Sequence, residues 1–420
     1  MLLPRWQQTL DRHGDAIAIH DGGRAIRFAE IDAALARLPR ATAPVIATGS
    51  ALEIIVSTLQ AWRDDQPLVP VERPDAALPD LSPFLPGSAL KPDFPVAHIK
   101  LTPGNDGRPR GVWFTASQIL ADADRLTSAM GLSPAMPNLA TLSLTHSYGY
   151  SSIVLPLLLH GVPMQTVEVP FPAALVEAWS GHERIVLPAV PSMWRAWHRS
   201  GILRDAPIAL ALSAGAPLSL DLEVAIWENH RLKLHNFYGC SECGGISFDA
   251  TDVPRSHPTD LGTPLPGVTV QVSADGRFVI HSDAVAQCYE STRDGEILGD
   301  GRFLTSDLGV VEKGRLIMAT RGGDHINVAG RKLGPGRIED ALKSTGLVGQ
   351  VRVFALPSAD PERVEEVAAI LPAGTDVMAL RLAATASLAT WEIPRHWFVA
   401  ESPADFQLPR TRLTSRHRVN

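Results

Sequence analysis

The stretch LTPGNDGRPRGV, Leu101–Val112, decides the fold, because it is a glycine-rich polar segment between two apolar ones. Gly104 and Gly107 permit backbone conformations closed to other residues and let amide groups approach a ligand closely. Arg108 and Arg110 add positive charge, so the segment can bind an anion such as phosphate. Glycine, proline, asparagine and aspartate also build plain exposed turns, so a simple turn is the alternative interpretation.

The segments on either side of this loop read as strands. PVAHIKLT precedes it and GVWFT follows it, and helical spacing begins only at Ala116 and continues to Met130, with Ser117 as the expected N-cap. A loop that joins two strands excludes a Walker-type P-loop and a dinucleotide fingerprint, because both of these open a helix directly. The alternation of short apolar runs with helical stretches predicts an α/β protein.

Composition places the chain among ordinary globular proteins. Its 420 residues are 45% apolar, enough for a large core in two or three domains. The net charge of −7 gives no electrostatic case for a nucleic-acid partner. The most apolar run, Ile153–Leu159, is far shorter than the ~20 residues that cross a bilayer, and three cysteines are too few for a disulfide framework. We therefore expect a cytoplasmic protein with neither a membrane segment nor a nucleic-acid partner.

A second informative stretch is KLHNFYGCSECGGISFD, residues 233–249, a strand that ends in a cluster of aromatic, hydroxyl and carboxylate residues. Tyr238 can stack on a base, Ser241 can hydrogen-bond a phosphate, and the hard oxygen ligand of Glu242 suits Mg²⁺. A core tyrosine and an exposed glutamate are the structural alternative. Cys240 and Cys243 have the spacing of a zinc half-site, but a zinc site needs about four ligands and the chain has no second pair.

Two further turns carry residues suited to a pocket. THSYGY, residues 145–150, is read as a polar turn in which His146 is either a structural residue or a catalyst, and in which Tyr148 can line a pocket for a flat substrate. AGAP, residues 214–217, is a small-residue turn against which a planar ring can lie. From residue 260 short strands with glycine turns predict a small barrel or meander, and a domain boundary is expected near residues 321–324.

Taken together, the order and spacing of these stretches resemble the acyl- and aryl-adenylate-forming ligases, the AMP-binding superfamily of acyl-CoA synthetases and peptide-synthetase adenylation domains. The resemblance covers nearly the whole chain, because the glycine loop, THSYG, SAGAP, FYGCSECGG, TSDLG and GRKLGPGRIED match family motifs in order. It implies a large N-terminal AMP-binding domain, residues 1–320, of mixed sheets and helices with a small β-barrel-like part. A small mobile α+β C-terminal lid domain, residues 321–420, is implied to follow.

The resemblance also implies roles for individual residues. Tyr238 would stack on adenine, and Asp307 would hold the ribose hydroxyls. Ser241 would face the α-phosphate, and Glu242 would bind Mg²⁺. The implied nucleotide contacts are Thr102, Gly104, Asn105, Gly107, Arg110, Ala214, Gly215, Ala216, Pro217, Tyr238, Gly239, Asp307 and the hinge residue Arg321. The implied acid pocket consists of His146, Tyr148, Gly149, Cys240 and Cys243, and the implied catalytic residues are Glu242, Ser241, His146 and Arg416.

The sequence departs from the family pattern where ATP is handled. Asn105 and Asp106 stand at loop positions that carry hydroxyl groups in the family, and Arg110 replaces the usual lysine. An aspartate that faces the β- and γ-phosphates would repel them unless a cation offsets its charge.

The C-terminal tail departs further. Its segment LPRTRLTSRHR resembles the family's Leu-Pro-Arg-Thr ending, but Ser415 stands where the family places its catalytic lysine, and no lysine follows Lys343. Arg416 is a candidate for the lysine's role. Arginine is bulkier and permanently charged, however, so it does not reproduce the geometry of lysine at a tight site.

The expected function is ATP-dependent activation of an aryl or acyl carboxylic acid as an acyl-adenylate, followed by transfer to a thiol of CoA or of a carrier protein. The implied cofactors are ATP or AMP, Mg²⁺, and CoA or phosphopantetheine. The implied partners are a small acid, aromatic or unsaturated, and an acyl carrier protein. Two alternatives stay open: an enzyme of this fold that acts on a pre-activated acyl substrate without adenylation, and a non-catalytic binding paralogue.

Overall fold

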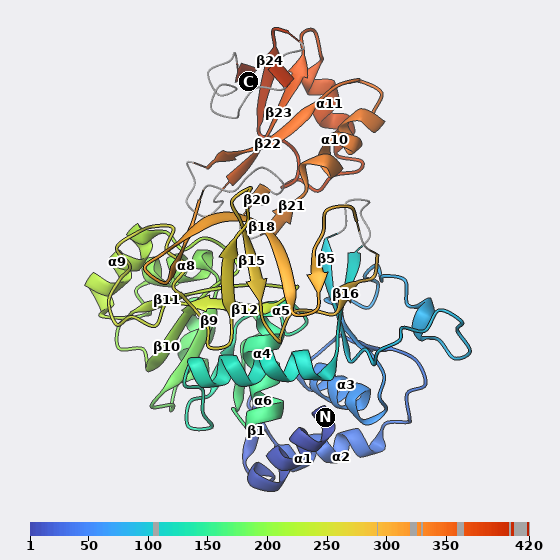
Figure 1. Ribbon diagram of the computed structural model, residues 1–420. Coiled ribbons are helices and arrows are strands. Elements are labelled where there is room, and N and C mark those ends of the chain that lie inside the picture. Colours follow the sequence, from blue (N-terminus) through green and yellow to red (C-terminus); the bar gives the residue numbers. More distant parts are fainter. Residues whose placement is uncertain are drawn as a thin grey trace. The chain divides into compact units, whose positions relative to one another are not determined.

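The computed structural model describes residues 1–103, 109–291, 293–319, 326–328, 331–358, 365–402, 405–406 and 418–419. The chain divides into two compact units, one made of Met1–Thr102 and Pro109–Thr320 and the other mainly of Arg321–Asn420. Each unit combines sheets with helices (Figure 1), which confirms the mixed α/β class.

A nine-stranded sheet forms the largest part of the first unit. Its strand order is β13 (Thr263–Pro264), β12 (Gly244–Phe248), β11 (Leu234–Cys240), β10 (Ile208–Ser213), β9 (Ile185–Ala189), β7 (Asn138–Ala140), β8 (Met164–Thr166), β1 (Ile17–Asp21) and β2 (Arg24–Arg27). The strands from β11 to β1 pair in parallel, and β2, β12 and β13 add antiparallel edges. Helices bury the central strands on both faces, which is why β9 reads as a continuous apolar run.

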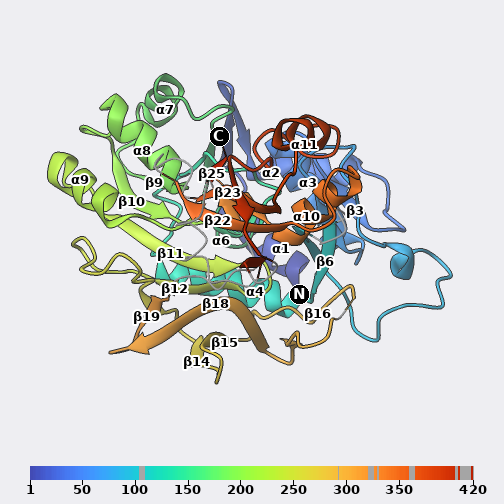
Figure 2. The same ribbon diagram turned by 90° about the horizontal axis from the view of Figure 1, so that it is seen from above.

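Helices cover the two faces of this sheet. One core cluster joins the face that carries Leu187 to α7 (Pro172–Trp179), α8 (Pro191–Ser200) and α9 (Leu220–His230). Figure 2 shows these three helices grouped on one side of the unit. A second cluster joins Val186, on the opposite face, to Leu126 of α4 (Ala116–Ala129). The N-cap of α4 is Thr115 and not Ser117, because the Gln118 side chain accepts a hydrogen bond of 2.8 Å from the Thr115 amide.

The segment after β7 is helical where a turn was expected. α5 (Ser147–Gly149) continues into a π-helical turn, η2 (Tyr150–Val154), and then into α6 (Leu155–His160). The predicted turn at residues 145–150 is therefore wrong from Ser147 onward. Residues 149–159 are all buried, so tertiary packing stabilises a helical backbone that the local sequence does not specify.

A second, five-stranded sheet carries the glycine loop. Its strand order is β16 (Cys288–Tyr289), β6 (Pro109–Phe114), β5 (His98–Pro103), β4 (Leu68–Pro70) and β3 (Val45–Ala47), and the loop joins β5 to β6 as predicted. Ile99 packs with Trp113 on one side of this sheet. Phe114 on the other side shares a core cluster with α1 (Leu2–His13), α2 (Phe28–Arg37) and α3 (Ala51–Arg63).

The remaining strands of the first unit form the expected meander of short strands. They are β14 (Thr269–Val272), β15 (Arg277–His281), β18 (Arg302–Glu312) and β17 (Leu298–Gly299), in that order, with β19 (Arg315–Met318) paired to β18. A short 3₁₀ helix, η1 (Ser82–Phe84), lies in the proline-rich segment before β5. The strands of the meander pair as antiparallel neighbours. A hydrogen bond between Asp307 of β18 and Tyr238 of β11 connects the meander to the large sheet.

The second unit has its own core. Its elements are the hairpin β20 (Ile326–Val328) and β21 (Arg331–Leu333), the sheet β22 (Arg352–Pro357), β23 (Glu365–Pro372), β24 (His396–Ala400) and β25 (Arg418–Val419), and the helices α10 (Pro335–Ser344) and α11 (Val377–Ala384). Ile338 and Leu380 from the two helices share a core cluster with Val353 and Ala369 from the sheet. Across the described parts of both units, every helix is too short or too polar to cross a membrane.

Candidate functional site

The candidate site is built around the hairpin that joins β11 to β12, whose turn is residues 241–243. The turn closes on Gly244, whose φ of +68° favours glycine and whose added Cβ would lie 2.2 Å from a carboxylate oxygen of Asp122. Asp122 is buried on α4 and accepts a hydrogen bond of 2.9 Å from the amide of Gly245. The helix therefore fixes the position of the turn.

Tyr238, on the strand that leads into this turn, is hydrogen-bonded to Asp307 of β18. Its hydroxyl donates to Asp307 Oδ2 at 2.7 Å. Burial, together with the charge of Asp307, raises the pKa of Tyr238 well above its usual value, so the phenol keeps its proton. Two residues that lie 69 positions apart in the sequence are thus joined in one site.

The helical segment with the THSYG sequence lies against the same turn. Ser147 Oγ and Ser241 Oγ are 3.0 Å apart, within hydrogen-bonding distance. His146 is exposed at the N-cap position of α5. Gly149 leaves no room for a side chain, because an added Cβ would lie 2.1 Å from the carbonyl oxygen of Ser143. Glycine at this position therefore allows the segment to pack closely.

Two of the residues expected to line the acid pocket have side chains that pack in the core. The Tyr148 hydroxyl is buried, and its ring lies 6.0 Å from that of Phe237. Cys243 is fully buried, and its Sγ lies 3.2 Å from that of Cys240. Both cysteines are free thiols. Within the described residues, no three His, Cys, Asp or Glu side chains come together to hold a metal.

Tyr289 connects Glu242 to an ion pair in which the arginine is buried and the carboxylate is partly exposed. The Tyr289 hydroxyl donates to Glu242 Oε1 at 3.2 Å, and the guanidinium carbon of Arg110 lies 3.6 Å from the centre of the Tyr289 ring. Both terminal nitrogens of Arg110 donate to the carboxylate of Glu296 at 2.6 Å. Burial alone would raise the pKa of Glu296, but the hydrogen bonds from Arg110 lower it, so the carboxylate stays ionised.

Arg110 was expected to contact a nucleotide, and the structure gives it a carboxylate partner within the chain. Its side chain is only 8% exposed, and Glu296 neutralises its charge. Sequence reasoning missed both Glu296 and Tyr289. The sole signal for Tyr289 was that the chain has only four tyrosines, and nothing distinguished Glu296 from other acidic residues in exposed loops.

Glu242 is suited to a hard cation such as Mg²⁺. Its side chain is partly exposed in the turn, and the hydrogen bond from Tyr289 is long, 3.2 Å. Mg²⁺ typically takes one or two carboxylates together with oxygen atoms of bound phosphates. The residues present therefore fit a Mg²⁺ ion that is shared between Glu242 and a phosphorylated ligand.

The other expected site residues fall into two groups. Thr102 is the penultimate residue of β5, and its Oγ1 donates to the carbonyl of Arg110 at 3.3 Å. Residues 214–217 form the turn between β10 and α9. Gly239 lies on β11, where an added Cβ would lie 2.6 Å from the carbonyl oxygen of Gly244. The residues Gly104, Asn105, Gly107, Arg321 and Arg416 lie outside the part of the chain that the structure describes.

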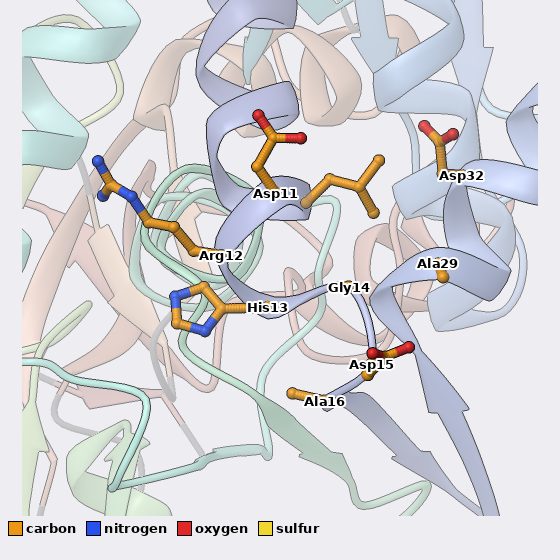
Figure 3. Close-up of a pocket in the computed structure, with 9 residues that line it drawn as sticks. Asp11, Arg12, His13, Gly14, Asp15, Ala16, Ala29 and Asp32 are labelled. Carbon is orange, nitrogen blue, oxygen red and sulfur yellow. The ribbon is translucent and has the colours of Figure 1, made fainter.

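An open hollow elsewhere on the first unit is separate from this site. It has a volume of about 430 Å³ and is lined by the end of α1, the following loop and the start of α2. Figure 3 shows Asp11, Asp15 and Asp32 among its lining residues. Asp32 already accepts a hydrogen bond of 3.0 Å from Trp6, which ties α1 to α2. We assign this hollow no function.

Comparison with known proteins gives concordant matches. Residues 46–298 match the model of a family described as "AMP-binding enzyme". The long-chain-fatty-acid–CoA ligase of Bacillus subtilis is 22% identical over 329 residues, which are 73% of this chain and 58% of that protein. The probable 2-succinylbenzoate–CoA ligase of Mycobacterium tuberculosis is 27% identical over 345 residues, which are 78% of this chain and 84% of that protein.

A solved structure shares the fold. The o-succinylbenzoate CoA synthetase of Bacillus subtilis matches with a TM-score of 0.80 and 18% identity, covering 99% of each chain. At this identity the likeness shows the fold alone. The chain spans little more than half of the fatty-acid ligase, 58% of its length.

Proposed function

Because the chain belongs to the AMP-binding enzyme family, we propose that it is an acid–thiol ligase that uses ATP to convert a small carboxylic acid into an acyl-adenylate. The observation that carries the proposal is the joining of Tyr238 and Asp307 beside the turn at residues 241–243. The phenol and the carboxylate would hold the adenosine, and the turn would face the phosphates.

In the proposed first step a carboxylate oxygen of the acid attacks the α-phosphorus of ATP, the bond to the bridging oxygen of the β-phosphate breaks, and pyrophosphate leaves. In the second step a thiol loses its proton to solvent, its sulfur attacks the acyl carbon, the bond from that carbon to the phosphate oxygen breaks, and AMP leaves with the bonding electron pair. The protein forms no covalent bond itself, so its residues act by positioning the reactants and by neutralising charge. Mg²⁺ held at Glu242 would supply part of that neutralisation.

The side chains around the turn suggest how the phosphate is held. With Ser147 and Ser241 3.0 Å apart, Ser147 can donate its hydroxyl proton to Ser241, and Ser241 can then donate its own to an α-phosphate oxygen. Arg110, which is paired with Glu296, would act by positioning Tyr289 and, through it, Glu242. Direct phosphate binding by Arg110 is not needed in this arrangement.

An aromatic or otherwise flat acid is the substrate class that we propose. One relative is named for 2-succinylbenzoate, an aromatic acid. CoA is the acceptor in the names of both relatives described above, and a carrier-protein thiol presents the same phosphopantetheine chemistry.

An ATP–pyrophosphate exchange assay tests this proposal. With a panel of benzoates, cinnamates and fatty acids, we expect exchange that depends on at least one acid. In Glu242→Ala the exchange should fall by about 100-fold or more, because a group that stabilises transition-state charge is lost. Glu183→Ala, at an exposed glutamate of the same unit, serves as the matched control and should leave the exchange rate unchanged.

The same purified protein distinguishes the two alternatives. Consumption of a synthetic acyl-adenylate or acyl-thioester without any exchange from free acid would point to an enzyme of pre-activated substrates. Binding of AMP by calorimetry with no turnover would point to a binding paralogue. A protein with no affinity for any adenine nucleotide would contradict the proposed function.

A further inference from the structure

Lys100 is a buried lysine whose charge the described residues do not compensate. It lies on β5, two residues before Thr102, and is 4% exposed. Within the described residues its ammonium makes no hydrogen bond or ion pair, and its recorded partner is the ring of Phe114, whose centre lies 4.6 Å from Nζ. Lysine is almost never fully buried unless it is paired, since a buried cation loses its hydration.

The other buried lysine of this unit shows how the chain usually compensates such a charge. Lys233 Nζ lies 2.5 Å from Glu223 and 2.6 Å from Asp249, both of which are fully buried. These two carboxylates replace the water that the ammonium loses on folding. Lys100 has only an aromatic face, which compensates a buried cation less than two carboxylates do, and this leaves its charge available to an anionic ligand.

Lys100 lies on the side of the five-stranded sheet that faces the candidate site. Side chains alternate along a strand, so Arg110, Val112 and Phe114 of β6 share one face. Tyr289 is paired directly with Val112 and therefore lies on that face, from which its hydroxyl reaches Glu242. The contact of Lys100 with Phe114 places the ammonium on this same side.

A second line of contacts connects Lys100 to the THSYGY segment. His98 precedes Lys100 by two residues on the same face of β5, and its ring lies 4.6 Å from that of Tyr150. Tyr150 directly follows Gly149 in the helical segment that contacts the Ser241 turn. Lys100 thus shares a face of the sheet with Tyr289, and it shares a face of β5 with His98, which contacts this segment.

We propose that Lys100 binds the carboxylate of the acid substrate and orients it for reaction, an inference that rests on the proposed function. The resemblance assigns contact with the acid to a lysine of the C-terminal tail, where this chain has Ser415 and no lysine follows Lys343. Arg110 is the other buried cation of the same sheet, but Glu296 neutralises it. A single ammonium over one aromatic ring matches one carboxylate on an apolar body better than it matches a polyphosphate of several charges.

A comparison of acids with their neutral amides tests this role. The probes are benzoate, cinnamate and octanoate, each paired with its carboxamide, and binding is measured by calorimetry. We expect the wild type to bind at least one acid about tenfold or more tightly than its amide, since charge-assisted hydrogen bonds are worth about 1.5–3 kcal/mol. Lys100→Met should abolish this preference while leaving AMP affinity unchanged. Lys91→Met, at an exposed lysine of the same unit, should keep it.

The outcomes separate this inference from the proposed function. A wild type with no preference for any acid over its amide, or a Lys100→Met variant that keeps the preference, overturns the role of Lys100 even if exchange activity is present. Should Lys100→Met not fold, Lys100→Arg is expected to keep part of the preference and Lys100→Gln to lose it. Equal preference in these two variants would likewise overturn the inference. Failure of AMP binding and of exchange would instead count against the ligase function.

Discussion

The hydroxyl of Tyr238 donates a hydrogen bond of 2.7 Å to Asp307, and this bond joins the large sheet of the first unit to the meander. Tyr238 is only 9% exposed, whereas Asp307 is partly exposed. A nucleotide bound here would meet a preformed carboxylate whose position the tyrosine fixes.

Replacing Asp307 should therefore weaken nucleotide binding more than it weakens the fold. We expect Asp307→Ala to lose about 10- to 100-fold in AMP affinity, in line with about 1.5–3 kcal/mol for a hydrogen bond to a charged group. Isothermal titration calorimetry measures the affinity, and Asp294→Ala, at an exposed aspartate, is the control. Equal AMP affinity in the two variants would contradict the role of Asp307.

The Arg110–Glu296 pair should contribute to stability as a coupled unit. Its side chains are 8% and 28% exposed, so solvent screens the pair only in part. We expect Arg110→Ala to lower the free energy of unfolding by about 2–4 kcal/mol, and a double-mutant cycle with Glu296→Gln to give a coupling energy of about 1 kcal/mol or more.

An exposed pair provides the control for this cycle. Arg277 and Asp275 are 35% and 56% exposed, and their cycle should give a coupling of about 0–1 kcal/mol. Urea unfolding followed by tryptophan fluorescence measures all four variants of each cycle. Couplings of the same size in the two pairs would show that the burial of Arg110 adds nothing.

Gly244 should tolerate a side chain less well than another glycine with a similar backbone. Both Gly244, φ +68°, and Gly314, φ +79°, lie in the left-handed region, which costs any L-residue about 1–2 kcal/mol. At Gly314 nothing lies within 4 Å of an added Cβ, whereas at Gly244 the carboxylate of Asp122 does. Thermal unfolding should show a larger fall in melting temperature for Gly244→Ala than for Gly314→Ala. An equal fall in the two variants would contradict a clash with Asp122.

His98 should make the protein less stable as the pH falls below about 6.5. Burial, together with the charge of Lys100, lowers the pKa of His98 well below its usual value. The unfolded chain therefore takes up a proton near pH ~6.5 that the native state takes up only at lower pH. The contribution of His98 to the free energy of unfolding is thus fully present above pH ~6.5 and is lost as the pH falls toward the pKa of the native state.

The variant His98→Gln should remove this part of the pH dependence. Between pH 6.5 and 5, its free energy of unfolding should fall less steeply than that of the wild type, by up to about 1.4 kcal/mol per pH unit. Urea unfolding at several pH values measures the two slopes. His257→Gln, at an exposed histidine, should keep the wild-type slope, and a His98→Gln slope no different from this control would exclude the assignment.

The local sequence was a good guide where neighbouring residues alone decide a structure. The glycine loop between two apolar runs does join β5 to β6, because strand propensity and turn chemistry act within a few residues. It was a poor guide at Ser147, where a helical backbone replaces the expected turn, and at the N-cap of α4, which is Thr115 rather than Ser117. Tertiary packing stabilises the helical backbone at Ser147, and the Gln118 side chain stabilises the N-cap at Thr115. The local sequence permits other conformations at both places.

The sequence by itself determined which chemical groups the site can contain: Tyr238, Ser241 and Glu242 follow one another along a strand and its turn, and Asp307 lies in a later strand. Only the tertiary structure decided their partners. It joins Glu242 to Tyr289, and it pairs Arg110 with Glu296 across 186 residues of sequence. These contacts depend on sheet order and strand register, which are set by packing between distant segments, and no local pattern in the sequence encodes them.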